Sequence, residues 1–158
     1  MRHDKGRTTF ADRDIRVCLQ GCSRLPTVRI AWDEWYCKTH ARETADRLAR
    51  ISVMERDRYT CQRSGLEAHD VHHIFTKAAW PSLRWEPDNL IALTRDAHVW
   101  WHANPAEAGS WFAEKFADRW ARLHAVRSIT RRFDLADVIS GFRELTPTEA
   151  AAYRDGDW

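Results

Sequence analysis

Hydrophobic and polar positions recur with two different periods along this chain, and the changes of period predict its elements. Residues 24–36 alternate apolar and polar side chains, which predicts a short hairpin. Residues 39–57 place small or apolar side chains at helical spacing among charged ones, which predicts one amphipathic helix or two shorter ones. These positions are Ala41, Ala45, Leu48 and Ile51. The front of the chain is therefore expected to pass from a hairpin into helix.

The middle of the chain predicts two strands and a helix. Residues 71–75 and 89–93 are short apolar runs suited to strands, and the prolines between them predict a loop over 76–88. A tight hairpin over 57–65 is expected before the first run. Thr94 is expected to cap a helix over the sequence RDAHVWWH. The expected order is strand, loop, strand, helix.

The last third of the chain is predicted to be helical. Residues 104–107 (NPAE) have the pattern of a capped helix start, and the helix is expected to continue along an aromatic stripe that packs in the core. The stripe consists of Trp111, Phe112, Phe116, Trp120 and Leu123. Residues 133–142 and the final TPTEAAAYRDGDW predict two further short helices, the second with an acidic tail. Residues 1–16 lack periodicity and predict a loose basic arm.

Composition narrows the class of protein. The 158 residues are 44% hydrophobic, and no apolar run approaches the roughly 18 residues that a membrane span needs. The N-terminal segment has charge but no apolar stretch behind it, which argues against a secretory signal. A cytoplasmic location is the resulting expectation, and the four cysteines are then expected to be reduced thiols.

Charge is unevenly distributed although the net charge is only +2. Residues 1–64 hold 14 Lys and Arg against 9 Asp and Glu, whereas residues 65–158 hold 11 against 14. A basic front half is able to contact phosphates, so DNA is one candidate partner. The alternative is an ordinary solvated surface of mixed charge.

Two pairs of potential metal ligands flank the predicted hairpin. Cys18 and Cys22 form a CxxxC pair, and Cys37 and His40 follow after fourteen residues. Three thiolates and one imidazole can surround a zinc ion tetrahedrally, and Gly21 permits a tight turn between the first two ligands. The sequence therefore predicts a structural zinc site. The alternative is three small buried cysteines and a surface histidine.

Five of the eight histidines lie between residues 69 and 102. His98 and His102 are four residues apart on the predicted helix and so share one face, where they can meet one histidine of the His72–His73 pair. Adjacent strand residues point to opposite faces, so the second histidine of the pair is left to act as a general base. Asn89 is expected to brace the long loop. Phosphodiester hydrolysis needs such a base together with a cation.

The spacing HH-x15-N-x8-H-x3-H resembles that of the HNH (ββα-metal) endonucleases, and among them the phage-type HNH proteins. The resemblance covers roughly residues 50–115, and residues 18–40 resemble the Cys/His zinc module that often precedes phage HNH domains. It implies that His73 is the general base and that Asn89 orients the loop or binds metal. His72, His98 and His102 correspond to ligands of a catalytic divalent ion, which could be Mg²⁺, Mn²⁺, Ni²⁺ or Zn²⁺.

The resemblance also implies an overall organisation. It predicts an α+β protein with a small ββα-metal core, flanking helices and an N-terminal zinc-knuckle-like module. The expected segments are a basic arm (1–16), the zinc module leading into a helix (17–45), the HNH domain (46–125) and a helical extension (126–158). DNA is the implied substrate, with a phage packaging or recombination protein and a second copy of the chain as further candidate partners.

One departure from the family pattern concerns a second zinc site. Many relatives hold zinc through two CxxC pairs around the active site, whereas the corresponding positions here are Cys61, Ser64, Thr94 and Ala97. That site is expected to be free of metal. Arg84 and Arg95 flank the loop and the helix and are predicted to contact DNA phosphates. The alternative function is a zinc-stabilised DNA- or protein-binding module with a vestigial HNH site.

Overall fold

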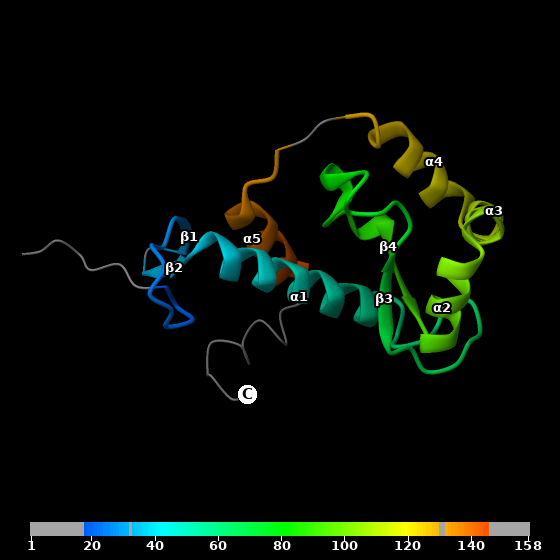
Figure 1. Ribbon diagram of the computed structural model, residues 1–158, viewed down its shortest axis with the longest axis horizontal. Helices are drawn as coiled ribbons and strands as arrows, with labels where there is room; N and C mark the ends of the chain where they lie inside the picture. The colour runs from blue at the N-terminus through cyan, green and yellow to red at the C-terminus, as the bar shows by residue number, and fades with distance from the viewer. Residues whose placement is uncertain (1–17, 32, 130–131, 146–158) are drawn as a thin grey trace, which may run out of the picture.

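A long helix, α1 (Lys38–Arg56), connects the two ends of the molecule (Figure 1). The computed structural model describes residues 18–31, 33–129 and 132–145. The predicted N-terminal arm and the predicted helix and acidic tail at the C-terminus lie outside these residues. The sequence predicted either one helix or two over residues 39–57, and the structure has a single helix there. It crosses the predicted domain boundary between residues 45 and 46.

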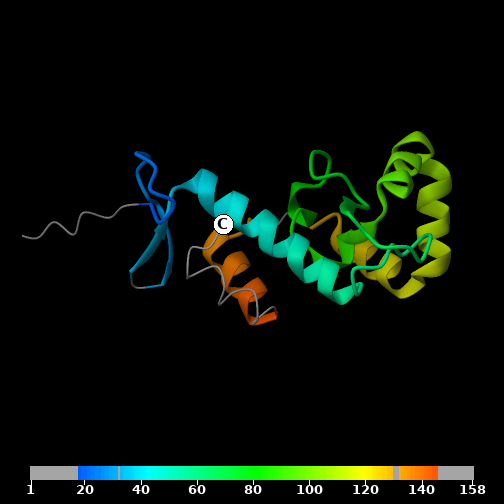
Figure 2. The ribbon, with the colours of Figure 1, turned by 90° about the horizontal axis from the view of Figure 1, so that it is seen from below.

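The N-terminal end of α1 carries an antiparallel hairpin, as the alternating pattern predicted. Strands β1 (Val28–Ala31) and β2 (Glu34–Tyr36) pair with each other, and Tyr36 is fully buried at their base. Helix α5 (Leu135–Leu145) lies beside α1 and β1 (Figures 1 and 2). Arg143 of α5 forms a two-pronged ion pair with Glu34 of β2, at 2.8 and 2.6 Å. This ion pair connects α5 directly to the hairpin.

The other end of α1 carries a second antiparallel pair followed by a helix. Strand β3 (Asp70–His73) pairs with β4 (Leu90–Leu93), placing His72 opposite Ile91. Two short 3₁₀ turns, η1 (Pro81–Leu83) and η2 (Pro87–Asn89), occupy the intervening loop. Helix α2 (Arg95–Ala103) begins at the predicted cap, where the Thr94 hydroxyl accepts from the Ala97 amide at 3.1 Å. The predicted α+β class is confirmed.

The predicted helix after residue 104 is two helices. Helix α3 (Pro105–Lys115) ends at Phe116, whose backbone leaves the helical region, and α4 (Ala117–Val126) follows at once. The break lets Phe112 and Phe116 both pack inward, with ring centroids 5.1 Å apart. Asn104 does not cap α3 with its side chain. It donates instead to the Trp100 carbonyl at 3.0 Å and closes the C-terminal end of α2.

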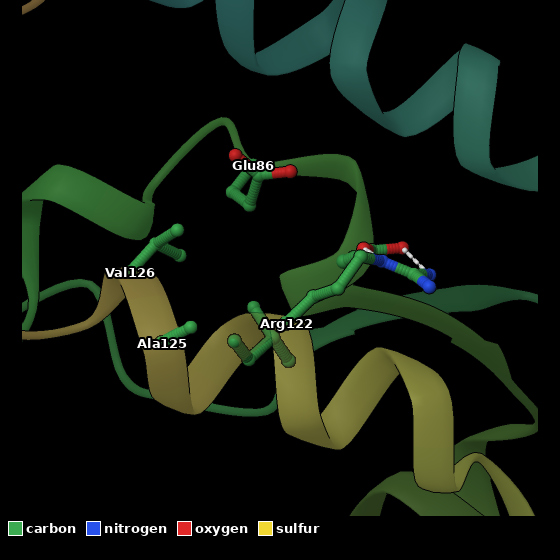
Figure 3. A pocket seen from close by; sticks show the side chains of 6 residues that line it. Glu86, Arg122, Ala125 and Val126 are labelled. Atoms are coloured by element: carbon green, nitrogen blue, oxygen red, sulfur yellow. Dashed lines mark hydrogen bonds and ion pairs between the residues drawn. The ribbon is translucent and has the colours of Figure 1, made fainter.

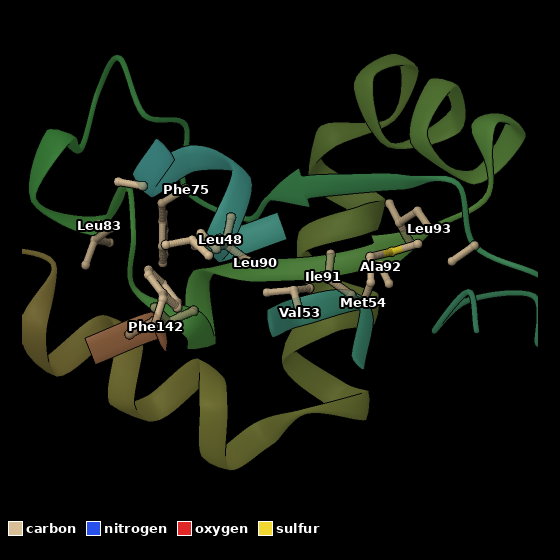
Figure 4. Close-up of a cluster of buried hydrophobic side chains, with 14 of the residues drawn as sticks. Leu48, Val53, Met54, Phe75, Leu83, Leu90, Ile91, Ala92, Leu93 and Phe142 are labelled. Atoms are coloured by element: carbon tan, nitrogen blue, oxygen red, sulfur yellow. The ribbon is translucent and has the colours of Figure 1, made fainter. Parts of the chain in front are cut away.

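One continuous apolar core joins α1, both strands of the second pair and the later helices (Figure 4). Every side chain of β4 is buried, whereas Ile51, which was expected on the apolar face of α1, is only half-buried. The C-terminal end of α1 is tied to β4 by Asp57, whose carboxylate accepts from the Ala92 amide at 2.9 Å. These contacts fix the position of α1 relative to the strand pair.

Candidate metal centres

Two groups of potential metal ligands lie at opposite ends of α1 in the described part of the chain. The first consists of Cys18, Cys22, Cys37 and His40, and the second of His72, His98 and His102. In each group, one ligand atom from every residue lies within 4.8 Å of the others. The nineteen residues of α1 span about 28 Å, so the two groups are separate sites.

The Cys/His group has the dimensions of a tetrahedral zinc site. The Cys18 sulfur lies 3.2 Å from His40 Nδ1, and the sulfurs of Cys22 and Cys37 lie 3.7 Å apart. Zn–S bonds of about 2.3 Å in a tetrahedron place two sulfurs roughly 3.8 Å apart, whereas a disulfide needs about 2.05 Å. All three thiols are free. The group could therefore hold a structural metal such as zinc, as the spacing predicted.

Local backbone geometry brings these four ligands together. Gly21 has a positive φ of 65°, and its amide donates to the Cys18 carbonyl, closing the turn between the first two cysteines. Cys37 is the N-cap of α1, and its sulfur accepts from the His40 amide at 3.5 Å. That backbone hydrogen bond is the main cause of the lowered pKa of Cys37. A lowered thiol pKa favours the thiolate that a metal requires.

The three histidines of the second group converge on one face of the strand pair. Their ring centroids are 4.9 Å apart in all three combinations, and Nε2 of His98 lies 3.2 Å from Nε2 of His102. Zn–N bonds of about 2.05 Å in a tetrahedron place two nitrogens roughly 3.3 Å apart. The positions on α2 confirm that the i and i+4 histidines share a face.

Burial prepares His72 to act as a neutral ligand. The residue is only 6% exposed, and its ring lies 4.7 Å from that of Trp101. This burial, with the nearby charges of His98 and His102, lowers the pKa of His72 to about 3. The imidazole is therefore unprotonated at neutral pH, as metal ligation requires.

Asp70 is a site residue that sequence analysis missed. It lies two residues before His72 and so on the same face of β3, and its Oδ2 lies 3.1 Å from Nδ1 of His98. A carboxylate on one ring nitrogen leaves the other nitrogen to face a metal. The same oxygen accepts from Arg95 at 3.1 Å. Strand alternation was the signal that could have identified Asp70.

Asp70→Asn is expected to weaken Mn²⁺ binding at the histidine group by roughly 10- to 100-fold, because the amide orients His98 less strongly. Calorimetric titration with Mn²⁺ measures this on protein loaded with one equivalent of zinc, because the thiolate group takes that zinc and leaves the histidine group free for Mn²⁺. Asp96→Asn, an exposed acidic residue on α2, is the matched control. Equal affinities for the two variants would contradict the assigned role of Asp70.

His73 lies on the opposite face of β3 from the three clustered histidines. Its Nε2 is 3.0 Å from the Arg84 carbonyl, which only accepts, so Nε2 carries the proton and Nδ1 has the free lone pair. Burial is the main cause of a lowered pKa for His73, opposed by the hydrogen bond to Arg84. The alternation of adjacent strand residues is confirmed.

Asn89 braces the loop between the strands, as predicted. Its side chain is fully buried and makes three hydrogen bonds. Oδ1 accepts from the Phe75 amide at 2.7 Å, and Nδ2 donates to the carbonyls of Phe75 and Leu83 at 2.9 Å each. Because every polar atom of this amide is used, it holds the loop closed across residues 75–89.

The two arginines predicted to contact DNA are both engaged with carboxylates. Arg84 forms a two-pronged ion pair with Asp46 of α1, at 2.9 and 2.5 Å, and Trp85 Nε1 donates to the same carboxylate at 2.8 Å. Arg95 is mostly exposed and pairs with Asp70. Asp46 was not predicted as a site residue, because no spacing rule connects positions 46 and 84.

The positions expected to lack a second zinc do come together. Cys61 is buried, its sulfur accepts from the Ser64 amide at 3.4 Å, and it lies 3.8 Å from the Thr94 hydroxyl. Burial of the thiol raises its pKa, but hydrogen bonds from the side chain and the backbone of Ser64 and from the backbone of Thr94 lower the pKa of Cys61 to about 7. Among the described residues, no third metal-ligating group includes Cys61. Hydrogen bonds of Cys61 with Ser64 and Thr94 close this turn.

A separate cavity of about 210 Å³ lies between the loop and α4 (Figure 3). Its polar lining consists of Glu86, Asp88 and Arg122, and the last two form an ion pair at 2.6 Å. The remaining lining from α4 is apolar. Neither ligand group borders this cavity, so it is distinct from the candidate metal centres.

The sequence matches no model of a known protein family, and no characterised protein or solved structure is significantly similar to it. In the described residues, no helix is both long and apolar enough to cross a bilayer.

Proposed function

We propose that this chain is a metal-dependent DNA endonuclease of the HNH (ββα-metal) type. The observation that carries the proposal is the arrangement of four histidines around β3. Three converge on one face with the spacing of metal ligands, and the adjacent His73 has an unprotonated nitrogen on the other face. The order of β3, β4 and α2 also fits a ββα-metal core.

The donor set fits a divalent cation. His72, His98 and His102 would hold it, with Asp70 orienting His98 through Nδ1. When bound, such an ion neutralises negative charge that develops on the phosphate and on the leaving oxygen. Three protein ligands leave positions for water and substrate, which is the arrangement of a catalytic rather than a structural site. The complete Cys/His group then serves as the structural site.

His73 supplies the proton acceptor in this proposal. The Arg84 carbonyl holds the proton on Nε2, so Nδ1 accepts a proton from the attacking water. The lowered pKa keeps the ring neutral at physiological pH, ready to act as a base. In the described residues β3 pairs only with β4. A phosphate at its other edge is therefore accessible to groups from both faces of the strand.

The experiment is nicking of supercoiled plasmid by dialysed protein supplied with Mg²⁺, Mn²⁺, Ni²⁺ or Zn²⁺. Wild type is expected to produce open-circular plasmid with at least one of these ions and none with excess chelator. His98→Ala is expected to lose the activity, whereas Val99→Ala, the exposed neighbour, is expected to keep it. No nicking by wild type with any ion, or equal nicking by His98→Ala, would favour the binding-module alternative.

A further inference from the structure

A cleft between α1 and β3 lies on the side of the strand away from the clustered histidines. It encloses about 180 Å³ and is formed by α1, both strands of the pair and the loop that connects them. Ala49, Val71 and Leu90 contribute apolar lining. The polar lining consists of Asp46, Arg50, His73, Lys77 and Arg84. The proposed base therefore faces a cavity that the metal ligands do not border.

The charges in this cleft do not cancel. Burial raises the pKa of Asp46, but hydrogen bonds from Arg84 and Trp85 lower it by a larger amount, so the carboxylate is ionised. Its negative charge cancels the positive charge of Arg84. Arg50 donates one hydrogen bond to the His69 carbonyl, and this uncharged partner does not neutralise the guanidinium. Lys77 makes no hydrogen bond or ion pair with any residue that the structure describes. The cleft thus retains two positive charges beside a neutral histidine.

We propose that this cleft binds a backbone phosphate of the DNA substrate, next to the phosphate that is cut. The proposal rests on the nuclease function. Successive phosphates of a DNA strand lie close together, since each strand carries one charge per about 3.4 Å of rise. With the cut phosphate at the free edge of β3, where groups from both faces of the strand reach it, the next phosphate along the DNA strand would lie over the cleft. Arg50 and Lys77 bind this second phosphate.

This assignment gives Arg84 a different role from the one that the sequence predicted. Its guanidinium is neutralised by Asp46, while its carbonyl holds His73. Asp46 is accordingly a positioning residue that anchors the loop beside the base. Asp46→Asn removes the counter-charge of Arg84 and is expected to strengthen DNA binding several-fold while slowing nicking. A residue with a purely structural role would not shift these two measurements in opposite directions.

The test measures DNA affinity by fluorescence anisotropy, with a short labelled duplex of arbitrary sequence at salt concentrations from about 50 to 200 mM. All proteins carry His98→Ala, which prevents cleavage under the nuclease proposal. Lys77→Gln and Arg50→Gln are each expected to lower the slope of log affinity against log salt by about 1. Arg122→Gln is the control, because Asp88 already balances that arginine.

Unchanged slopes for both Lys77→Gln and Arg50→Gln, or slopes equal to that of Arg122→Gln, would overturn the phosphate subsite. The result is independent of cleavage. If wild type does not nick plasmid but the slope is lower in each of the two variants, the phosphate subsite stands and the nuclease function fails. If wild type nicks plasmid and the slopes are unchanged, the nuclease function stands and the subsite fails.

Discussion

Replacing His73 by alanine is expected to slow single-turnover plasmid nicking by roughly 100- to 10,000-fold, the usual contribution of a general base. Metal content is expected to remain that of wild type, because His73 lies across β3 from His72 and outside the ligand group. DNA affinity should also change little, since a neutral ring is removed. Rate constants at saturating metal, with metal content measured on the same samples, provide the comparison.

His69→Ala is the matched control for this prediction. His69 is an exposed histidine four residues before His73, and it accepts a hydrogen bond from Arg50 through its backbone carbonyl rather than its side chain. Its replacement is expected to leave the nicking rate within about twofold of wild type, as is usual for exposed sites away from the chemistry. A His73→Ala protein that nicks as fast as His69→Ala would exclude His73 as the base.

Cys37→Ser is expected to release about one equivalent of zinc and to lower the melting temperature substantially. Binding of a structural zinc ion contributes about 10–16 kcal/mol to folding in zinc-finger peptides, and each kcal/mol lost lowers the melting temperature of a chain of this size by about 2–4 °C, so a fall of about 20 °C or more is expected. Serine is itself a favourable N-cap, so the start of α1 is preserved and the effect reports on the metal. Elemental analysis and thermal unfolding measure the two effects.

Cys61→Ser is the control for the zinc prediction, because Cys61 is a buried thiol outside the Cys/His group. It is expected to retain the full zinc content. Its thermal stability should fall only because two hydrogen bonds of the thiol weaken, the one accepted from the Ser64 amide and the one donated to the Thr94 hydroxyl. Equal zinc contents in Cys37→Ser and wild type would show that residues 18–40 do not form a zinc site.

Local rules predicted most of the histidine site. The four-residue spacing of His98 and His102 on a helix, the opposite faces of His72 and His73, and the Thr94 cap each follow from the period of one element. All three are confirmed. The Cys/His group was predictable for the same reason, because its ligands fall in two short segments joined by a hairpin.

Contacts between distant segments were not predictable. The pairing of Asp46 with Arg84 joins α1 to the loop across 38 positions, and no periodicity connects them. The sequence therefore suggested Arg84 as a phosphate ligand when its guanidinium is bound to a carboxylate. The break between α3 and α4 also escaped prediction, because the aromatic stripe keeps helical spacing through Phe116 and only packing selects the break.

Helix α1 contacts both regions that contain the candidate metal centres. It begins at a ligand of the Cys/His group, and six residues beyond His40 it presents Asp46, which pairs with Arg84, the residue whose carbonyl holds His73. Its other end is hydrogen-bonded to β4 through Asp57. A rigid α1 therefore relates the position of the structural metal site to that of the proposed base.

The most direct test is the single-turnover nicking rate, in protein loaded with one equivalent of zinc, as a function of Mn²⁺ occupancy of the His72–His98–His102 group. We expect a rate that rises in proportion to occupancy and that is abolished, together with Mn²⁺ binding, in His102→Ala. A rate independent of occupancy, or a His102→Ala protein that nicks at the wild-type rate, would contradict the assignment of this group as a nuclease centre.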